Sequence, residues 1–522
     1  MRLESFVLPK PPSSLRQLVR LLAICRTLAR YDLIRPLPLW EAAPWFLRLT
    51  RLFTNSRQRD RPLGQRLSAA LQELGPAFIK FGQTLATRAD LVGDDVAAAL
   101  AGLQDRLPPF AAAQARAAIE SGLGRPVEAL FESFDERPLA AASIAQVHLA
   151  VTASGEPVAV KILRPGIEAQ FARDLALFAW LARLFERWVP SLRRLRPQEV
   201  VRTLARSVTF EMDLRFEAAA ASELADNFAG DASFRVPGID WERTGKRVLT
   251  LARVDGLRID DRAALIEAGQ DLRTVLTNAA SAFFNQVFRD GFFHADMHPG
   301  NLFVAPDGGI VAVDFGIMGR LDLGTRYFLA DMLVGFLSGD YRRVAEVHFA
   351  AGYVPADQSI ESFTQACRSI GEPLLGKPLA DISLGRLLAQ LFEVTETFQM
   401  ETQPQLLLLQ KSMLVAEGIG RNLDPTVNMW ELARPLIEDW VRENRGPEAR
   451  LKQLVGGSVR TIERLPHLAG RLIDLLERGE KSVVHLHADT VEALAEAIAR
   501  RRLLPWALLW LAILILAIMA LS

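Results

Sequence analysis

Residues 294–301 read HADMHPGN, and Asp314 opens the tripeptide DFG thirteen residues later. Asp296 stands five residues before Asn301, and far upstream the strand-like stretch VAVK ends at Lys161. Phosphoryl transfer uses these residue types, because an ammonium group binds the triphosphate, two hard oxygen ligands bind Mg²⁺, and a carboxylate lies near the nucleophile. The order of these residues therefore predicts a site for Mg-ATP.

The same order and the same Asp-to-Asn spacing occur in the protein-kinase signature. Between the two parts of the motif, NLFV and GIVAVDF flank the turn cluster PDGG at 306–309, which predicts a strand–turn–strand unit. One alternative is that Asp314 caps a turn and Lys161 is a solvated strand end. Another is that His294 and His298, spaced i and i+4, bind a metal on a helix. The complete set in this order favours the kinase-like site.

A lysine that binds phosphates needs a carboxylate partner on a helix behind it. The helical stretch from about residue 200 to 228 contains EMDLRFEAAA, which offers Glu211 and Asp213, with Glu217 after the next turn. Glu211 is the preferred candidate because of its order in the chain, fifty residues after Lys161. The alternative for these carboxylates is a solvated helix face.

The loop expected to cover the nucleotide departs from the kinase pattern. A protein kinase has a Gly-rich loop between its first two strands, so that backbone N–H groups approach the phosphates. Here the corresponding stretch is AAASIAQVH, which begins with Ala140, Ala141, Ala142 and Ser143. Alanine keeps the loop small but disfavours the positive φ angles that glycine permits. We therefore expect a phosphate-binding loop of a different shape.

These features resemble the UbiB family of atypical kinases (the AarF/ADCK group), which supports ubiquinone biosynthesis. The matching motifs are KFGQ at 80–83, AAASIAQVH at 140–148, VAVK at 158–161, EMD at 211–213, HADMHPGN at 294–301 and DFG at 314–316. The resemblance extends from about residue 65 to 425, and KFGQ together with HADMHPGN is its most specific part. Ala86 replaces an expected serine, a departure that affects no catalytic role.

The resemblance implies roles for five of these residues. Lys161 would contact the phosphates, with Glu211 as its ion-pair partner. Asn301 and Asp314 would be the Mg²⁺ ligands. Asp296 would be the catalytic-loop aspartate, which accepts or orients a hydroxyl proton. ATP and Mg²⁺ are therefore the expected cofactors.

The resemblance also implies a helix that covers the active site. Lys80 and Gln83 lie on this helix, which in relatives occupies the place where a protein kinase takes its peptide, and Asp213 would be its partner. Such a cover disfavours ordinary protein phosphorylation. It leaves ATP hydrolysis, or transfer to a small lipid-like acceptor, as the expected reaction.

Composition excludes several classes of protein. The chain has 522 residues, of which 50% are hydrophobic, so a disordered protein is excluded. Two cysteines are too few for a disulfide framework. Lysine and arginine total 61, as do aspartate and glutamate, and this balance argues against a dedicated nucleic-acid binder.

Both ends of the sequence point to a membrane. Residues 503–521 form an uncharged stretch of nineteen residues that follows three arginines at 500–502. A helix of about 20 apolar residues spans a bilayer core, and the arginines favour a cytoplasmic near end. Residues 1–70 carry 13 Arg/Lys and 4 Asp/Glu, so they are expected to lie against anionic headgroups or to form a solvated helix face. No signal peptide is recognised.

The predicted fold is α+β and mostly helical, a bilobal protein-kinase-like fold with an N-terminal helical extension and a C-terminal transmembrane helix. The expected parts are the extension with the KFGQ helix (1–110), a kinase-like N-lobe (111–255) and C-lobe (256–445), a helical juxtamembrane region (446–502) and the transmembrane helix (503–522). The catalytic part would lie in the cytoplasm, anchored to the inner membrane.

The expected function is that of an atypical kinase or ATPase that supports ubiquinone biosynthesis. Its expected partners are membrane lipids and polyprenyl quinone precursors, with other ubiquinone-biosynthesis proteins as further candidates and no nucleic acid. The alternatives are a protein kinase acting on a biosynthetic enzyme and a nucleotide-binding scaffold. A monooxygenase is disfavoured, because the sequence has no Rossmann GxGxxG unit and no convincing metal-ligand cluster.

Overall fold

The computed structural model describes ten ranges of the chain. They are 15–33, 60–86, 92–103, 108–188, 196–373, 394–395, 397–400, 404–426, 435–436 and 440–442. Contacts divide the chain into residues 1–442 and 443–522, and the second unit lies outside the described residues, as does the predicted transmembrane stretch. Within the described ranges, no helix combines the length and the hydropathy that crossing a bilayer requires.

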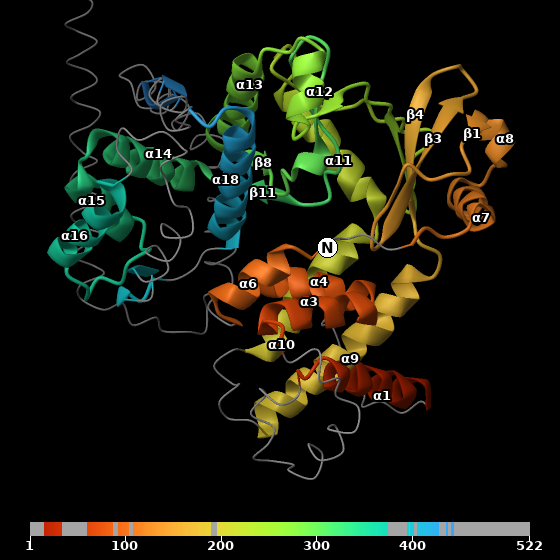
Figure 1. Cartoon of the computed structure of the whole chain (residues 1–522), viewed down its shortest axis with the longest axis horizontal. Helices are drawn as coiled ribbons and strands as arrows, with labels where there is room; N and C mark the ends of the chain where they lie inside the picture. The colour runs from red at the N-terminus through yellow and green to blue at the C-terminus, as the bar shows by residue number, and fades with distance from the viewer. Residues whose placement is uncertain are drawn as a thin grey trace, which may run out of the picture. The chain divides into compact units, whose positions relative to one another are not determined.

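An antiparallel sheet carries the sequence around Lys161 (Figure 1). Its strands are β1 (Phe131–Phe134), β2 (Ala140–Ala141), β3 (Ala145–Thr152), β4 (Pro157–Leu163) and β6 (Val248–Ala252). They are arranged β1-β3-β4-β6, with β2 paired to β3. Gly155 has φ 86° in the turn between β3 and β4, which pair as an antiparallel hairpin. Helices α7 (Ala112–Leu123) and α8 (Val127–Leu130) pack on this sheet, where Ile119 and Val160 share one core cluster.

Six helices form a second packed group before and after this hairpin. They are α1 (Leu15–Arg30), α3 (Leu63–Leu74), α4 (Pro76–Ala86), α6 (Asp94–Ala101), α9 (Ile167–Trp188) and α10 (Pro197–Glu211). In the KFGQ segment on α4, a Cβ at Gly82 would lie 2.5 Å from a methyl group of Leu103 and 2.7 Å from one of Leu71. The lack of a side chain at Gly82 therefore lets both leucines pack closely against α4. Arg20 of α1 pairs with the buried Asp174 of α9 at 2.9 Å, which ties the two helices together.

The region with the HADMHPGN and DFG motifs combines short strands with helices. Its elements are α11 (Leu214–Asn227), β5 (Phe234–Arg235), β7 (Leu257–Arg258), α12 (Arg262–Glu267), α13 (Leu272–Phe284), the π-helix η5 (Asn285–Asp290), β8 (Phe292–His294), the 3-10 helix η6 (Pro299–Asn301), β9 (Leu302–Val304), β10 (Ile310–Ala312) and β11 (Met318–Arg320). One sheet has the order β5-β10-β9-β7, and β11 pairs with β8. The predicted strand–turn–strand unit is confirmed, since Ile310 of β10 lies opposite Val304 of β9.

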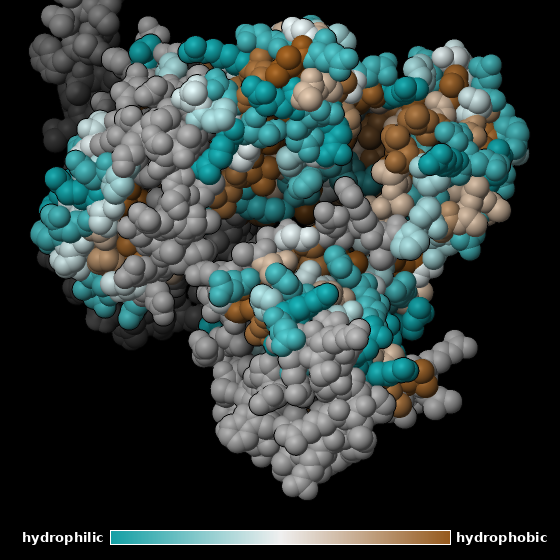
Figure 2. Space-filling model, in the orientation of Figure 1, coloured by the Kyte–Doolittle hydropathy of each residue, from teal (hydrophilic) through white to brown (hydrophobic). Residues whose placement is uncertain are grey.

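Four more helices follow in the part of the chain that the structure describes. They are α14 (Leu323–Ser338), α15 (Tyr341–Ala350), α16 (Ile360–Gly371) and α18 (Pro404–Leu423). Asp322, Asp340 and Ser359 cap the first three by accepting a hydrogen bond from a backbone N–H three residues on, which satisfies a donor that the helix leaves unpaired. On the face shown in Figure 2, small patches of hydrophobic residues lie among hydrophilic residues.

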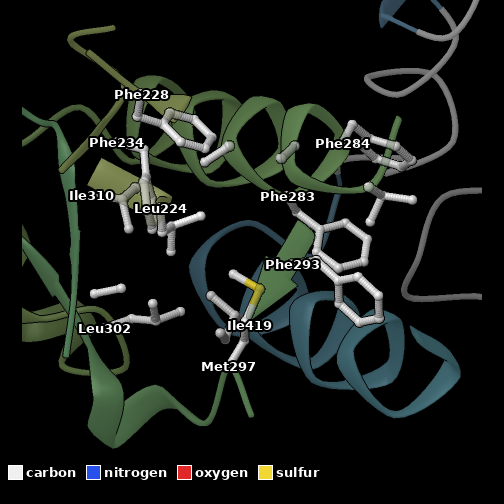
Figure 3. Packing of buried hydrophobic residues seen from close by; sticks show 14 of the residues in the cluster. Leu224, Phe228, Phe234, Phe283, Phe284, Phe293, Met297, Leu302, Ile310 and Ile419 are labelled. Carbon is white, nitrogen blue, oxygen red and sulfur yellow. The ribbon is translucent and has the colours of Figure 1, made fainter. Parts of the chain in front are cut away.

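The largest hydrophobic cluster joins α18 to the HADMHPGN segment. Figure 3 shows members from both, with Met297 of the segment and Ile419 of α18 in the same cluster as Phe283 of α13 and Phe293 of β8. These four side chains are at most 5% exposed. The strand and loop that carry Asp296 are therefore packed against a helix more than a hundred residues later in the sequence.

Candidate functional site

Lys161 lies on a central strand and points to an acidic pair. It stands on β4, opposite Val147 on β3 and Leu249 on β6. Its Nζ donates to Glu217 Oε1 at 2.8 Å and lies 3.1 Å from Asp314 Oδ1. The strand thus brings an ammonium group to the DFG aspartate, 153 positions away in sequence. The predicted approach of Lys161 to Asp314 is confirmed.

Burial and neighbouring charges shift the pKa values of Lys161, Glu217 and Asp314. Burial alone would lower the pKa of Lys161, but the carboxylates of Asp314 and Glu217 raise it above its ordinary value. Burial raises the pKa of the Glu217 carboxyl to about 7, against the opposing effect of Lys161. Burial favours a higher pKa for the Asp314 carboxyl, but the Lys161 ammonium outweighs burial and lowers this pKa to about 2. Asp314 is therefore ionised at neutral pH, as a metal ligand must be.

The prediction that Glu211 is the partner of Lys161 is wrong. Glu211 ends α10 and pairs with Lys80 of α4, with Nζ and Oε2 2.9 Å apart. Glu217 lies one turn into α11, on the side that faces β4, and pairs with Lys161 instead. Order along the chain could not separate these carboxylates, because the break between α10 and α11 turns them toward different lysines.

The ion pair that holds the KFGQ helix in place uses a different carboxylate from the one predicted. Asp213, predicted to be its partner, instead caps α11 by accepting from the backbone N–H of Arg215, and it pairs with the Arg215 guanidinium at 2.7 Å. Glu211 provides the ion pair to α4. Gln83 Nε2 donates to the carbonyl of Leu103 at 3.5 Å. Lys80 and Glu211 are nearly buried, so a desolvated ion pair holds α4 against the C-terminal end of α10.

A buried histidine holds the HADMHPGN segment in place. His294 Nδ1 accepts from the backbone N–H of Asp296 at 3.1 Å, so the neutral ring carries its proton on Nε2, which faces the carbonyl of Val313 at 3.4 Å. Burial lowers the pKa of His294, consistent with this neutral form. Its backbone N–H donates to Gln286 Oε1 at 2.9 Å. His294 therefore links the loop before Asp296 to the strand before Asp314.

The two predicted metal ligands lie on adjacent backbone segments. The N–H of Val313 donates to the carbonyl of Asn301 at 2.9 Å, which places Asn301 next to Asp314. Asn301 Nδ2 donates to the carbonyl of Asp296 at 3.1 Å and leaves its Oδ1 as the atom that can meet a metal. Asp314 has φ 63°, a strained backbone for a residue other than glycine and one that is concentrated at functional sites.

This donor set fits Mg²⁺ bound together with nucleotide. Mg²⁺ is typically held by one or two protein oxygens plus substrate phosphates and water, rather than by a complete protein cage. In the described ranges, no group of three or more His, Cys, Asp or Glu side chains forms such a cage. The alternative of a helical two-histidine metal site is wrong, because His294 ends β8 and His298 precedes η6.

The alanine-rich loop is tightly closed. Ala142 N–H donates to the carbonyl of Ala145 at 2.8 Å, and the Arg164 guanidinium donates to the carbonyl of Ala142 at 2.8 and 3.1 Å. Ser143 is fully buried, and in the described part of the chain its hydroxyl has no hydrogen-bond partner. Ala140 and Ala141 form β2. Hydrogen bonds from Arg164 therefore hold in place the loop that is predicted to cover the nucleotide.

Sequence reasoning missed two residues of this site. Gln286 lies in a π-helix, a distortion often found at functional sites, but no sequence signal marks it. Lys411 of α18 pairs with the carboxylate of Asp296, with Nζ and Oδ1 2.8 Å apart. No spacing rule could connect Lys411 to a motif 115 positions earlier.

Comparisons with known proteins find one family over most of the chain. A family model described as the ABC1 atypical kinase-like domain matches residues 102–348, and one described as the UbiB helical domain matches residues 367–428. "Probable protein kinase UbiB" of Pseudomonas putida is 45% identical over 480 residues, covering 90% of this chain and 87% of the relative. The protein of the same name from Azotobacter vinelandii is 45% identical, covering 86% and 85%. A solved complex of a Mycobacterium tuberculosis protein with erythromycin aligns with a TM-score of 0.49 and 26% identity, covering 68% of this chain and 90% of that one.

Proposed function

Because the chain belongs to the UbiB family of atypical kinases, we propose that it binds Mg-ATP and couples its hydrolysis or phosphoryl transfer to ubiquinone biosynthesis at the membrane. The acceptor side of the reaction would be polyprenyl-phenol precursors, which the protein makes accessible to the enzymes that modify them. Other proteins of the biosynthetic complex would be its partners.

One observation carries the catalytic part of this proposal. Lys161 reaches both Glu217 and Asp314, and the backbone of Asn301 lies against that of Val313, next to Asp314. Bound Mg-ATP would supply the phosphoryl group and neutralise the charge that develops on it. Lys161 would then hold phosphate oxygens, while Asn301 and Asp314 hold the metal and Asp296 orients the attacking hydroxyl.

The membrane part of the proposal rests on sequence. Residues 503–521 carry no charge and follow three arginines, so they suit a single span into the inner membrane with the catalytic part in the cytoplasm. Polyprenyl precursors partition into the bilayer at about 0.8 kcal/mol per buried CH₂. An enzyme tethered in the same bilayer gains effective concentration without any new contact.

The test uses the full-length protein in vesicles prepared with and without anionic lipid. ATP turnover is measured with and without a phenolic quinone precursor, and Asp296→Asn and Asp314→Asn serve as inactive variants. Stimulation by both the lipid and the precursor is expected, together with lowered cellular ubiquinone in the Asp314→Asn strain. Normal ubiquinone in that strain would contradict a catalytic contribution, and rescue of a deletion strain by Asp296→Asn would point to a nucleotide-binding scaffold.

A protein substrate is the second candidate, because the named relatives are called probable protein kinases. It predicts transfer of phosphate from ATP to a purified ubiquinone-biosynthesis enzyme, lost in the Asp296→Asn variant. The helix α4, held against the end of α10 by the Lys80–Glu211 pair, supports the lipid-coupled reaction instead, since in relatives this helix covers the place where a peptide would bind.

A further inference from the structure

The catalytic aspartate meets a lysine from outside the kinase-like domain. Lys411 Nζ donates to Asp296 Oδ1 at 2.8 Å, within the range of a charge-assisted hydrogen bond. Lys411 lies on α18, in the part that matches the UbiB helical domain, whereas Asp296 lies in the part that matches the kinase-like domain. The two domains thus meet at the carboxylate that is expected to handle the proton.

The helix that carries Lys411 is fixed at several points. Asn422 Nδ2 donates to the carbonyl of Asp260 at 3.0 Å, and Arg262 Nε donates to the carbonyl of Leu423 at 3.2 Å. Ser412, the next residue, is fully buried, and its hydroxyl lies 3.4 Å from the carbonyl of His294. Lys411 therefore reaches the loop that carries Asp296 from a helix that is packed in place, not from a mobile segment.

Neither histidine of the HADMHPGN motif supplies this charge to the Asp296 carboxylate. His294 is neutral, because burial lowers its pKa and its Nδ1 accepts a backbone hydrogen bond. His298 stands two residues after Asp296, and its Nδ1 accepts from the N–H of Gly300 at 3.1 Å. In the described part of the chain, the side-chain ion pair to Asp296 comes from α18.

Stability does not explain the pair. The Lys411 side chain is 45% exposed and that of Asp296 is 34% exposed. Exposed ion pairs of this kind contribute little to folding, because water screens them and two flexible side chains must be ordered. What the pair does determine is where the Asp296 carboxylate points, and a carboxylate that orients a hydroxyl depends on its direction.

We propose that Lys411 is a positioning residue for phosphoryl transfer, supplied by the helical domain, which holds the carboxylate of Asp296 toward the acceptor hydroxyl. The inference rests on the proposed function and adds a specific role for the helical domain, which completes the active site of the kinase-like domain.

The test compares three variants of the full-length protein. Lys411→Met removes the charge, Lys411→Arg keeps it, and Lys246→Met makes the same change at an exposed lysine in the turn before β6. We expect Lys411→Met to lower kcat for ATP at least about tenfold, while the affinity for a non-hydrolysable Mg-ATP analogue changes less than about twofold. Lys411→Arg should recover most of the turnover, and Lys246→Met should match the wild type.

The outcomes separate this inference from the proposed function. Full turnover in Lys411→Met, alongside inactive Asp296→Asn and Asp314→Asn, would overturn the role of Lys411 and leave the function standing. A parallel loss of kcat, analogue affinity and melting temperature, without recovery in Lys411→Arg, would mean that Lys411 only supports the fold and would also overturn it. Wild-type turnover no higher than that of Asp314→Asn would overturn both.

Discussion

Lys161 pairs with Glu217 at 2.8 Å, whereas Glu211, six residues earlier, pairs with Lys80 at 2.9 Å. The two glutamates flank the break between α10 and α11 and serve different parts of the molecule. Glu217 belongs to the proposed nucleotide site, and Glu211 belongs to the attachment of α4. Substitutions at the two positions should therefore have different consequences.

Glu217→Gln should weaken Mg-ATP binding. Without the second carboxylate, Lys161 is held by Asp314 alone and is drawn away from the phosphates, so we expect about a tenfold loss of affinity, equivalent to about 1.4 kcal/mol. Isothermal titration with a non-hydrolysable Mg-ATP analogue measures it. Glu211→Gln is the matched control, and its affinity should stay within about twofold of the wild type. An equal loss of analogue affinity in both variants would show that the Lys161–Glu217 pair does not govern binding.

The sequence predicted the elements of the site better than its pairings. The motifs correctly predicted that Lys161 and Asn301 lie near Asp314, because in a kinase-like fold these segments meet at one site. They did not distinguish Glu211 from Glu217, since a helix break decides which way a carboxylate faces. Lys411 could not be predicted from the sequence, because its contact with Asp296 depends on how a distant helix packs. The membrane span at 503–521 remains a prediction.

Nucleotide affinity should fall as the pH is lowered through about 7. Burial raises the pKa of Glu217 to about 7, so its carboxyl is ionised above this pH and protonated below it. Protonation removes one of the two charges that hold Lys161, whereas Asp314, with a pKa of about 2, stays ionised. Analogue affinity measured from about pH 8 to pH 6 should therefore decline in the wild type.

The control for this pH dependence is Glu217→Gln, which has no titrating group at that position. Its affinity should be low and should vary less between about pH 8 and pH 6. Protonation of the nucleotide itself affects both proteins alike, so the difference between the two curves isolates Glu217. Parallel curves for the two proteins would rule out Glu217 as the titrating group.

Glu211→Gln should destabilise the attachment of α4. The side chains of Lys80 and Glu211 are 11% and 9% exposed, so removing the charge of Glu211 takes this ion pair from an ammonium group that is already desolvated. Breaking such a pair costs about 3–5 kcal/mol, whereas replacing both members by apolar residues is often neutral. We expect faster amide hydrogen exchange in α4 for Glu211→Gln, and near wild-type exchange for the Lys80→Met/Glu211→Leu double variant. Unchanged exchange in the single variant would contradict the pairing.

Gly319→Ala should disturb the strand that leads into the catalytic loop. Gly319 lies opposite Phe293, and a Cβ there would come within 2.1 Å of the buried Phe293 ring. Overpacking of this kind costs about 1–3 kcal/mol, and here it would also shift His294, so stability measured by urea unfolding and ATP turnover should fall together. Gly418→Ala, in an exposed turn of α18 with nothing within 4 Å of its Cβ, should instead stabilise by about 0.5–1 kcal/mol. Restoration of turnover by Phe293→Leu in the Gly319→Ala background would identify the ring contact as the cause, and a Gly319→Ala variant as stable and active as the wild type would refute it.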